Sequence, residues 1–394
     1  MLIVGGGIAG LGLSLALARR GIGSRIIERR ATFSEAGAGI QISPNGVRAL
    51  EDLGIRAALE PLCGRPQAIH VHGANGSLLQ RLPLGAWIEA RHGAPYLVAH
   101  RRDLQAALLD AVRRQTSIEI STGFEVAGFA TAGDGVTLTS SIGSTVTGRA
   151  LVGADGVFSC IRAHLHAGFA PRFAGRTAAR AILDTNAVAG LLDPAVTGVW
   201  LARDSHVVHY PVRGGREIAV VMIRTETWAD SGAEIGWSAP LERAALAAAL
   251  EPFAPRLQQA LATAQDWRRW ALFEAPPLPA AGLGSAIGMG RVTQIGDAAH
   301  PILPFLAQGG ALALEDAVTL ANALATHGDD VAAAFRAHER LRWPRTIAIA
   351  RAAKRNGWIY HLGGFAARGR DTALRHLPPE RIMAGYDWIY GWRP

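Results

Sequence analysis

The chain has 394 residues, of which 49% are hydrophobic, so it is long and apolar enough to form two domains with a sizeable core. It contains no run of eighteen apolar residues and no charged-then-apolar leader, so we expect a cytoplasmic protein without a membrane span. The two cysteines, Cys63 and Cys160, form no CxxC pair, which argues against a disulfide framework and against a bound metal.

The formal net charge of +8 comes almost entirely from dispersed arginines. No basic run is interleaved with aromatic residues, so the sequence argues against a nucleic-acid partner. A basic surface of this kind favours small anions, such as a pyridine nucleotide or a carboxylated substrate. We expect a monomer or a homodimer.

The chain opens on a dinucleotide-binding fingerprint. An apolar strand at Leu2–Val4 runs into glycines at Gly5, Gly7 and Gly10, and a helix follows. A second apolar strand then ends at Glu28, 18 residues after Gly10. The glycines allow a tight turn, close approach of a pyrophosphate and close helix packing, while the acid accepts hydrogen bonds from a ribose. Almost no residues precede the strand, which fits either a short first strand or a chain start further upstream.

Further elements follow in chain order. Ser43 and Pro44 predict a helix start, with the helix running towards Gly54. Alternating runs broken by glycine, asparagine and proline predict a meander of strands over 65–98. A helix is predicted over 100–114, and Gly133 and Gly135 mark a hairpin turn. The other strands of this half are predicted at 118–120, 125–129, 136–140 and 150–152.

The pattern changes at about residue 172. Strands at 206–210 and 218–223 and a helix over 241–250 predict an inserted domain, and the chain returns to the first domain at about residue 291. We therefore expect an α/β protein with a Rossmann-like domain, an inserted mixed-sheet substrate domain and a helical C-terminus. The Rossmann-like domain is assigned to 1–64, 99–170 and 276–394, and the substrate domain to 65–98 and 171–275.

Two later motifs combine glycine with an acid. Asp155-Gly156 lies at a strand-to-helix junction, where it is either an ordinary turn or a place to hold an anion or a ribose. The run 296–301, Gly-Asp-Ala-Ala-His-Pro, follows a strand, and a helix opens near Gly309. Asp297 can bind a ribityl hydroxyl, and the positive end of that helix can stabilise an anionic reduced flavin.

Taken in order, these motifs resemble the FAD-dependent aromatic hydroxylases, the single-component flavoprotein monooxygenases. The resemblance covers essentially the whole chain. Within that family, three segments and the aromatic tail are similar to the group of salicylate hydroxylase, 3-hydroxybenzoate 6-hydroxylase and 6-hydroxynicotinate monooxygenase. These segments are 37–45, 209–215, 303–309 and 386–392.

The resemblance implies roles for individual residues in binding FAD. The glycine turn would line the pyrophosphate, Glu28 and Arg29 the adenosine ribose, and Val126 the adenine. Arg101 and Asp297 would reach the pyrophosphate and the ribityl chain. The full cofactor-binding set implied by the resemblance is Gly5, Gly7, Ala9, Gly10, Glu28, Arg29, Arg101, Val126, Asp155, Asp297, Gly310 and Ala311, with Gly310 and Ala311 at the flavin pyrimidine edge and Asp155 shared between FAD and NAD(P)H.

The resemblance also implies the catalytic side chains. His206 and Tyr210 match positions that relatives place over the flavin, and on a regular strand they share a face. They would bind the substrate and take or polarise a phenol proton, unless they are only a surface histidine and a core tyrosine. Pro304 would shape the loop at the reacting edge. Arg180 could anchor a substrate carboxylate, although the aromatic neighbour that relatives often carry beside it is missing here.

The resulting expectation is an enzyme that reduces FAD with NADH or NADPH and uses O2, through a flavin C4a-hydroperoxide, to hydroxylate a small phenolic or heteroaromatic acid, with or without decarboxylation. One alternative is a flavin monooxygenase of a larger polyketide-like or heterocyclic substrate. Another is a dinucleotide-binding protein without catalytic turnover.

Overall fold

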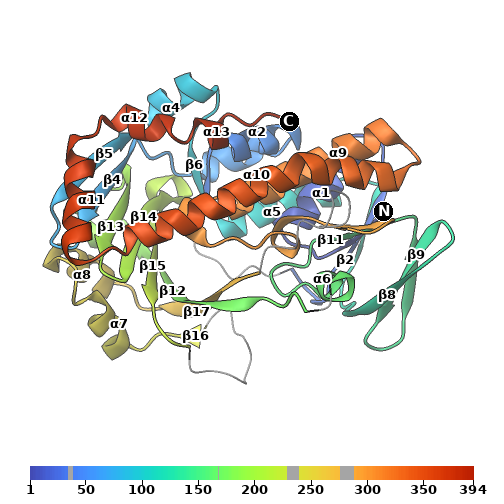
Figure 1. Cartoon of the computed structure of the whole chain (residues 1–394), viewed down its shortest axis with the longest axis horizontal. Helices are drawn as coiled ribbons and strands as arrows, with labels where there is room; N and C mark the ends of the chain where they lie inside the picture. Colours follow the sequence, from blue (N-terminus) through green and yellow to red (C-terminus); the bar gives the residue numbers. More distant parts are fainter. Residues whose placement is uncertain (34–38, 167, 229–238, 276–287) are drawn as a thin grey trace.

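The computed structural model describes residues 1–33, 39–166, 168–228, 239–275 and 288–394. Figure 1 shows a five-stranded sheet on the side of the N-terminus, an eight-stranded sheet on the opposite side, and the long helix α10 (Val331–Tyr360) running along both. This is the predicted α/β fold with a Rossmann-like domain, a second mixed sheet and a helical C-terminus.

The five-stranded sheet is parallel throughout and has the order β18-β11-β1-β2-β7. Its central strand, Leu2–Val4, is apolar and buried at every position, as expected of a strand covered on both faces. The strands are β1 (Leu2–Val4), β2 (Ser24–Ile27), β7 (Ile118–Ser121), β11 (Leu151–Gly153) and β18 (Val292–Gln294).

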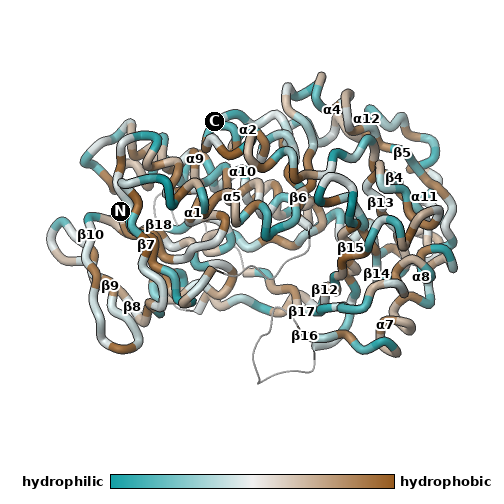
Figure 2. Tube along the Cα trace, turned by 180° about the vertical axis from the view of Figure 1, so that it is seen from behind, coloured by the Kyte–Doolittle hydropathy of each residue, from teal (hydrophilic) through white to brown (hydrophobic). Residues whose placement is uncertain are grey.

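Helices cover one face of this sheet. The helix α1 (Ile8–Ala18) is apolar all round because it lies between the sheet and α9 (Gly309–His327), and α5 (Arg101–Arg113) packs beside it. A three-stranded antiparallel sheet covers the other face, with Val136 and Leu138 packed against β1, β2 and β11. Figure 2 shows this small sheet at the edge of the molecule. Its strands are β8 (Val126–Ala132), β9 (Gly135–Ser140) and β10 (Thr145–Gly148).

The eight-stranded sheet has the order β16-β17-β12-β15-β14-β13-β4-β5 and is antiparallel except between β13 and β4. It therefore joins strands from 65–98 to strands from 171–275. The strands are β4 (Ala68–Gly73), β5 (Leu78–Pro83), β12 (Arg172–Asp184), β13 (Val196–Ala202), β14 (Ser205–Val212), β15 (Glu217–Thr225), β16 (Ala239–Pro240) and β17 (Arg268–Glu274).

The two faces of this sheet have different neighbours. The outer face packs against α7 (Arg243–Leu250) and α8 (Pro255–Ala262). The inner face packs against the N-terminal part of α9, against α10 and against the C-terminal helices. Every second residue of each strand therefore turns towards the Rossmann-like domain.

The C-terminal helices tie the two sheets together. Arg48, on α2 (Pro44–Asp52), donates to the backbone oxygens of Tyr390 and Trp392 at 2.8 and 2.9 Å, which fixes the chain end against the first domain. The helices after α10 are α11 (Gly364–His376), α12 (Pro379–Ala384) and α13 (Asp387–Tyr390). The remaining short elements are β3 (Gly39–Ile42), α3 (Arg56–Leu59), α4 (Gly85–His92), β6 (Leu97–His100) and α6 (Cys160–Leu165), with 3₁₀ turns η1 (Glu60–Leu62), η2 (Asn186–Val188), η3 (Arg213–Gly215), η4 (Gly296–Ala298) and η5 (Pro304–Leu306).

One element prediction is wrong. Residues 85–92 form the helix α4 rather than a strand of the meander, and Gly93 ends this helix in a left-handed conformation with φ of 71°. Part of the glycine-rich segment 37–45, at 37–38, lies outside the described residues. Over the ranges that are described, no helix has both the length and the apolar character needed to cross a membrane.

Candidate active site

The glycine turn between β1 and α1 has the geometry of a phosphate cradle. Gly5 has φ of 106°, and a Cβ there would lie 2.4 Å from the oxygen of Ala154. A Cβ at Gly10 would lie 1.9 Å from the oxygen of Gly5. A Cβ at Gly7 would meet nothing within 4 Å, so the turn is open above that residue. Because the first N–H groups of α1, around Ala9, have no partner inside the helix, this opening can receive a pyrophosphate.

Glu28 lies at the end of β2, beside the turn. Its carboxylate accepts hydrogen bonds from the backbone N–H of Gly6 at 2.8 Å and of Arg30 at 3.0 Å. It is half-buried, and Arg29 is exposed next to it. Glu28 therefore holds the glycine turn in shape and retains lone pairs for a ribose. Arg101 is half-buried at the first position of α5.

The Asp155-Gly156 motif holds a helix start. Oδ2 of Asp155 accepts from the N–H groups of Cys160 and Ile161 at 2.8 and 3.3 Å, and Ser159 caps the same helix, α6. The buried Arg162 reaches from α6 to the backbone oxygens of residues 297 and 298. Asp155 thus fixes the start of α6, and Arg162 on that helix holds the 296–301 motif. Val126, at the start of β8, packs on the cluster around β1.

Asp297 follows β18 in the turn η4. Its side chain is exposed, yet protein surrounds it closely enough to raise the pKa of its carboxyl, against the attraction of His300, Arg101 and Arg162. That combination is expected of a group that faces a hollow in the protein. The preceding residue, Gly296, has φ of 58° and donates to Oδ2 of Asp316 at 2.8 Å, which fixes the turn.

Behind this turn, α9 and α10 share a buried charge network. Arg342 donates to Glu315 at 2.5 Å and to Asp316 at 2.6 Å, and all three side chains are buried. Arg345 also pairs with Glu315, which accepts a further bond from Asn45 at 2.7 Å. The network joins the start of α2 and both long helices to the segment that carries Asp297.

Gly310 and Ala311 lie in the first turn of α9. A Cβ at Gly310 would lie 2.4 Å from the side chain of Ile40, so glycine there allows β3 to approach the helix end. Ala311 is buried against α2, where a Cβ at Gly46 would meet it at 3.1 Å. The positive end of α9 therefore lies beside β3.

The inner face of the eight-stranded sheet brings three predicted side chains together. His206, Val208 and Tyr210 alternate along β14, and the register places Val208 opposite Val221 of β15 and Val221 opposite Arg180 of β12. Both valines are only half-buried in the middle of the sheet, whereas His206, Tyr210 and Arg180 are buried. The result is an apolar floor with a histidine, a tyrosine and an arginine around it.

Tyr210 and Arg180 have defined contacts. The Tyr210 hydroxyl donates to the backbone oxygen of Gly39 at 3.1 Å, which links the sheet to β3. Burial raises the pKa of this hydroxyl, and the charges of Arg101 and Arg180 oppose the change. The guanidinium of Arg180 lies over the ring of Trp270, 4.7 Å from its centre. Trp270 thus supplies an aromatic partner for the arginine from the neighbouring strand rather than from the neighbouring residue.

His206 lies among aromatic rings at the other end of this floor. Its ring centre is 5.5 Å from that of Phe305, 5.3 Å from Tyr360 and 5.1 Å from His361. Nδ1 of His206 is 2.8 Å from Nε2 of His361, which is hydrogen-bonding distance. Pro304 is exposed and starts η5, whose next residue is the buried Phe305.

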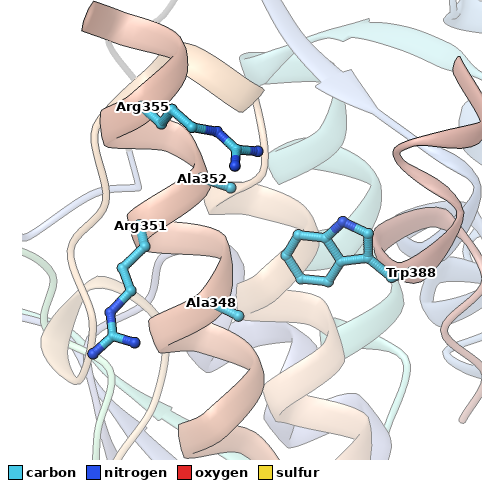
Figure 3. A pocket seen from close by; sticks show the side chains of 5 residues that line it. All are labelled: Ala348, Arg351, Ala352, Arg355 and Trp388. Atoms are coloured by element: carbon cyan, nitrogen blue, oxygen red, sulfur yellow. The ribbon is translucent and has the colours of Figure 1, made fainter. Parts of the chain in front are cut away.

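A different hollow lies on the outside of α10. It has a volume of about 490 Å³ and is lined by Ala348, Arg351, Ala352, Arg355 and Trp388. In Figure 3 the indole of Trp388 faces the alanines, and the guanidinium of Arg351 points away from it. The lining of this hollow consists of two alanines, two arginines and a tryptophan.

Comparison with known proteins identifies the family. A family model described as an FAD binding domain matches residues 1–335.

The chain belongs to the FAD binding domain family.

Among its relatives, the 3-hydroxybenzoate 6-hydroxylase of Polaromonas naphthalenivorans (strain CJ2) is 33% identical over 100% of this chain and 96% of that protein. The 3-amino-4-hydroxybenzoate 2-monooxygenase PtmB3 of Streptomyces platensis is 35% identical over 99% of this chain and 95% of that protein. The crystal structure of Klebsiella pneumoniae HpxO, complexed with FAD and uric acid, superposes with a TM-score of 0.85 and 26% sequence identity. The match covers 99% of this chain and 96% of that one. The prediction of an FAD-dependent aromatic hydroxylase is confirmed.

The residues of this FAD binding domain protein fit the cofactor. The turn is open above Gly7, the positive end of α1 faces that opening, and Glu28 and Asp297 offer carboxylates near it. Sequence reasoning missed the charge network of Arg342 and the partner of His206. An acid pair within the otherwise apolar helix at 309–327 was the one available signal for the network.

Proposed function

We propose that this protein hydroxylates a phenolic ring acid of the hydroxybenzoate type, using O2 and electrons from NADH or NADPH. The observation that carries the proposal is the inner face of the eight-stranded sheet. There His206, Tyr210 and Arg180 surround the half-buried floor of Val208 and Val221. An aromatic ring fits an apolar floor, a carboxylate pairs with an arginine, and a phenol needs a base.

The side chains have separate roles in this proposal. His206 and Tyr210 are four residues apart, hence about 13 Å along the strand, so they flank a substrate rather than contact each other. His206 takes the phenol proton, because an ionised ring is a better nucleophile than a neutral one. Arg180 binds the carboxylate, with its guanidinium held flat on Trp270. Pro304 shapes the loop in which Phe305 packs between α10 and the ring of His206.

FAD, when bound, supplies the activation of O2. The chain's part is to hold that cofactor and to exclude water from the ring. We assign Gly5, Gly7, Ala9 and Gly10 to the pyrophosphate. The other proposed cofactor contacts are Glu28, Arg29, Arg101, Val126, Asp155, Asp297, Gly310 and Ala311. We also propose the division into a cofactor domain at 1–64, 99–170 and 276–394 and a substrate domain at 65–98 and 171–275.

Anaerobic stopped-flow reduction tests the proposed function. The holoenzyme is mixed with NADH or NADPH in the presence of salicylate, 3-hydroxybenzoate, 3-amino-4-hydroxybenzoate or 6-hydroxynicotinate, and flavin absorbance is followed. We expect one phenolic acid to accelerate reduction and to be hydroxylated when O2 is admitted. Urate is mixed in the same way as a heterocyclic comparison. Acceleration by urate alone would reject a phenolic acid as substrate, and a protein purified without flavin would reject the proposed activity.

Asp297→Asn is expected to weaken FAD retention. The carboxylate is a charged hydrogen-bond acceptor, and replacing it with an amide turns each bond that it accepts into a neutral one, which costs about 1–1.5 kcal/mol per bond, or about five- to tenfold in Kd. Fluorescence titration of the apoprotein with FAD measures the change. Asp329→Asn changes an exposed acid that pairs with Arg149 on the surface, and it is the control. Equal affinity of both variants for FAD would remove Asp297 from the cofactor site.

A further inference from the structure

The predicted base, His206, is itself hydrogen-bonded to a second histidine. His361 lies immediately after α10, and its Nε2 is 2.8 Å from Nδ1 of His206. Both imidazoles are buried, with exposed fractions of 2% and 8%. With Nδ1 used in this way, Nε2 of His206 is the nitrogen left to face a substrate.

The second histidine leads to the surface. Nδ1 of His361 is 3.4 Å from the hydroxyl of Thr225, the last residue of β15, and Thr225 is exposed. The backbone oxygen of His361 accepts from the N–H of Asp204, in the exposed turn between β13 and β14. These contacts hold the imidazole between a buried nitrogen on one side and a solvent-exposed hydroxyl on the other.

Charges around the pair oppose a lasting imidazolium. Burial, His361 and Arg176 hold the pKa of His206 well below its ordinary value. Burial, Arg176 and Arg370 lower the pKa of His361 to about 4, against the attraction of Asp204. Both rings are therefore neutral near pH 7. A neutral imidazole that accepts a proton at one ring nitrogen must therefore release a proton from its other ring nitrogen. The positive charge of Arg176 favours the phenolate that remains after the substrate loses its proton.

We propose that His361 is the second member of a proton relay that carries the phenolic proton of the substrate from His206 to Thr225 and to solvent. The inference rests on the proposed function, since it needs a phenol facing His206. The substrate O–H bond breaks and its proton binds Nε2 of His206. The Nδ1 proton of His206 moves to Nε2 of His361, and the Nδ1 proton of His361 passes to water at the Thr225 hydroxyl. Both imidazoles end neutral in their other tautomers, and the phenolate keeps the electron pair.

Proton release on ligand binding tests the relay without turnover. Oxidised holoenzyme in weak buffer is mixed with 3-hydroxybenzoate in a stopped-flow instrument. A pH indicator reports release, and the flavin spectrum reports binding. In the wild type we expect release to follow binding without delay. In His361→Gln the amide still hydrogen-bonds to His206 but passes no proton, so release is expected to slow by about tenfold or more while binding stays unchanged.

His376→Gln is the matched control, because His376 is exposed at the end of α11 and touches none of these groups. Release at the wild-type rate in His361→Gln overturns the relay. If that variant fails to fold, Thr225→Val tests the exit, since Thr225 is at an exposed strand end: slowed release supports the relay and unchanged release rejects it. A wild type that binds none of the phenolic acids rejects the proposed function and the relay together, whereas normal release in both His361→Gln and the wild type rejects the relay alone.

Discussion

Arg342→Met is expected to lower the free energy of unfolding by about 3–5 kcal/mol, because it leaves two buried carboxylates without their shared cation. Glu315 and Asp316 are fully buried, and the guanidinium of Arg342 binds both. Methionine keeps most of the side-chain volume, so the loss comes from charge rather than from a cavity. Urea unfolding of the holoenzyme, followed by circular dichroism, measures the change.

Two further variants separate charge from packing. Arg345→Met removes a cation that is partly exposed and pairs with Glu315 alone, so a smaller loss is expected. Without Arg342, Glu315 keeps Arg345 and Asp316 keeps His300 as partners, but the buried cluster carries excess negative charge. Adding Glu315→Gln and Asp316→Asn to Arg342→Met removes that excess charge and should recover part of the stability. If the triple variant were no more stable than Arg342→Met, the cost would lie in packing and not in the buried charges.

Local sequence patterns were sufficient to predict the tight glycine turn after β1 and the two faces of the strand β14. The glycines at 5, 7 and 10 act within one turn, where backbone sterics decide the conformation. The alternation along β14 places His206 and Tyr210 on one face because a strand repeats every two residues. The turn conformation and the alternation of side chains both depend only on residues that are close together in the sequence.

The missed features depend on the packing of distant segments. His206 and His361 are 155 residues apart in the sequence, and Arg342 reaches Asp316 only because α10 lies along α9. No local periodicity reports how two helices dock. The helix at 85–92 was missed for a different reason: it has eight residues, and Gly93, which ends it, resembles a turn glycine between strands.

His206→Asn is expected to lower the rate of ring hydroxylation by about 10²–10⁴, since the substrate loses the base that ionises it. FAD binding is expected to be unchanged, because the side chain lies on the inner face of β14 among the rings of Phe305, Tyr360 and His361. Oxidation of NADH or NADPH should continue and yield hydrogen peroxide in place of product. Product and peroxide are measured together against nicotinamide consumed.

Raising the pH distinguishes a lost base from a disturbed pocket. A phenol has a pKa of about 10, so it ionises unaided as the pH approaches that value, and the deficit of His206→Asn should then shrink. Tyr210→Phe should show a smaller loss of coupling. His209→Asn, three residues after His206 on the same strand but on the outer face beneath α7 and α8, should keep the wild-type coupling in folded protein. A deficit in His206→Asn that stays constant up to pH 10 would mean that His206 shapes the pocket and does not accept the proton.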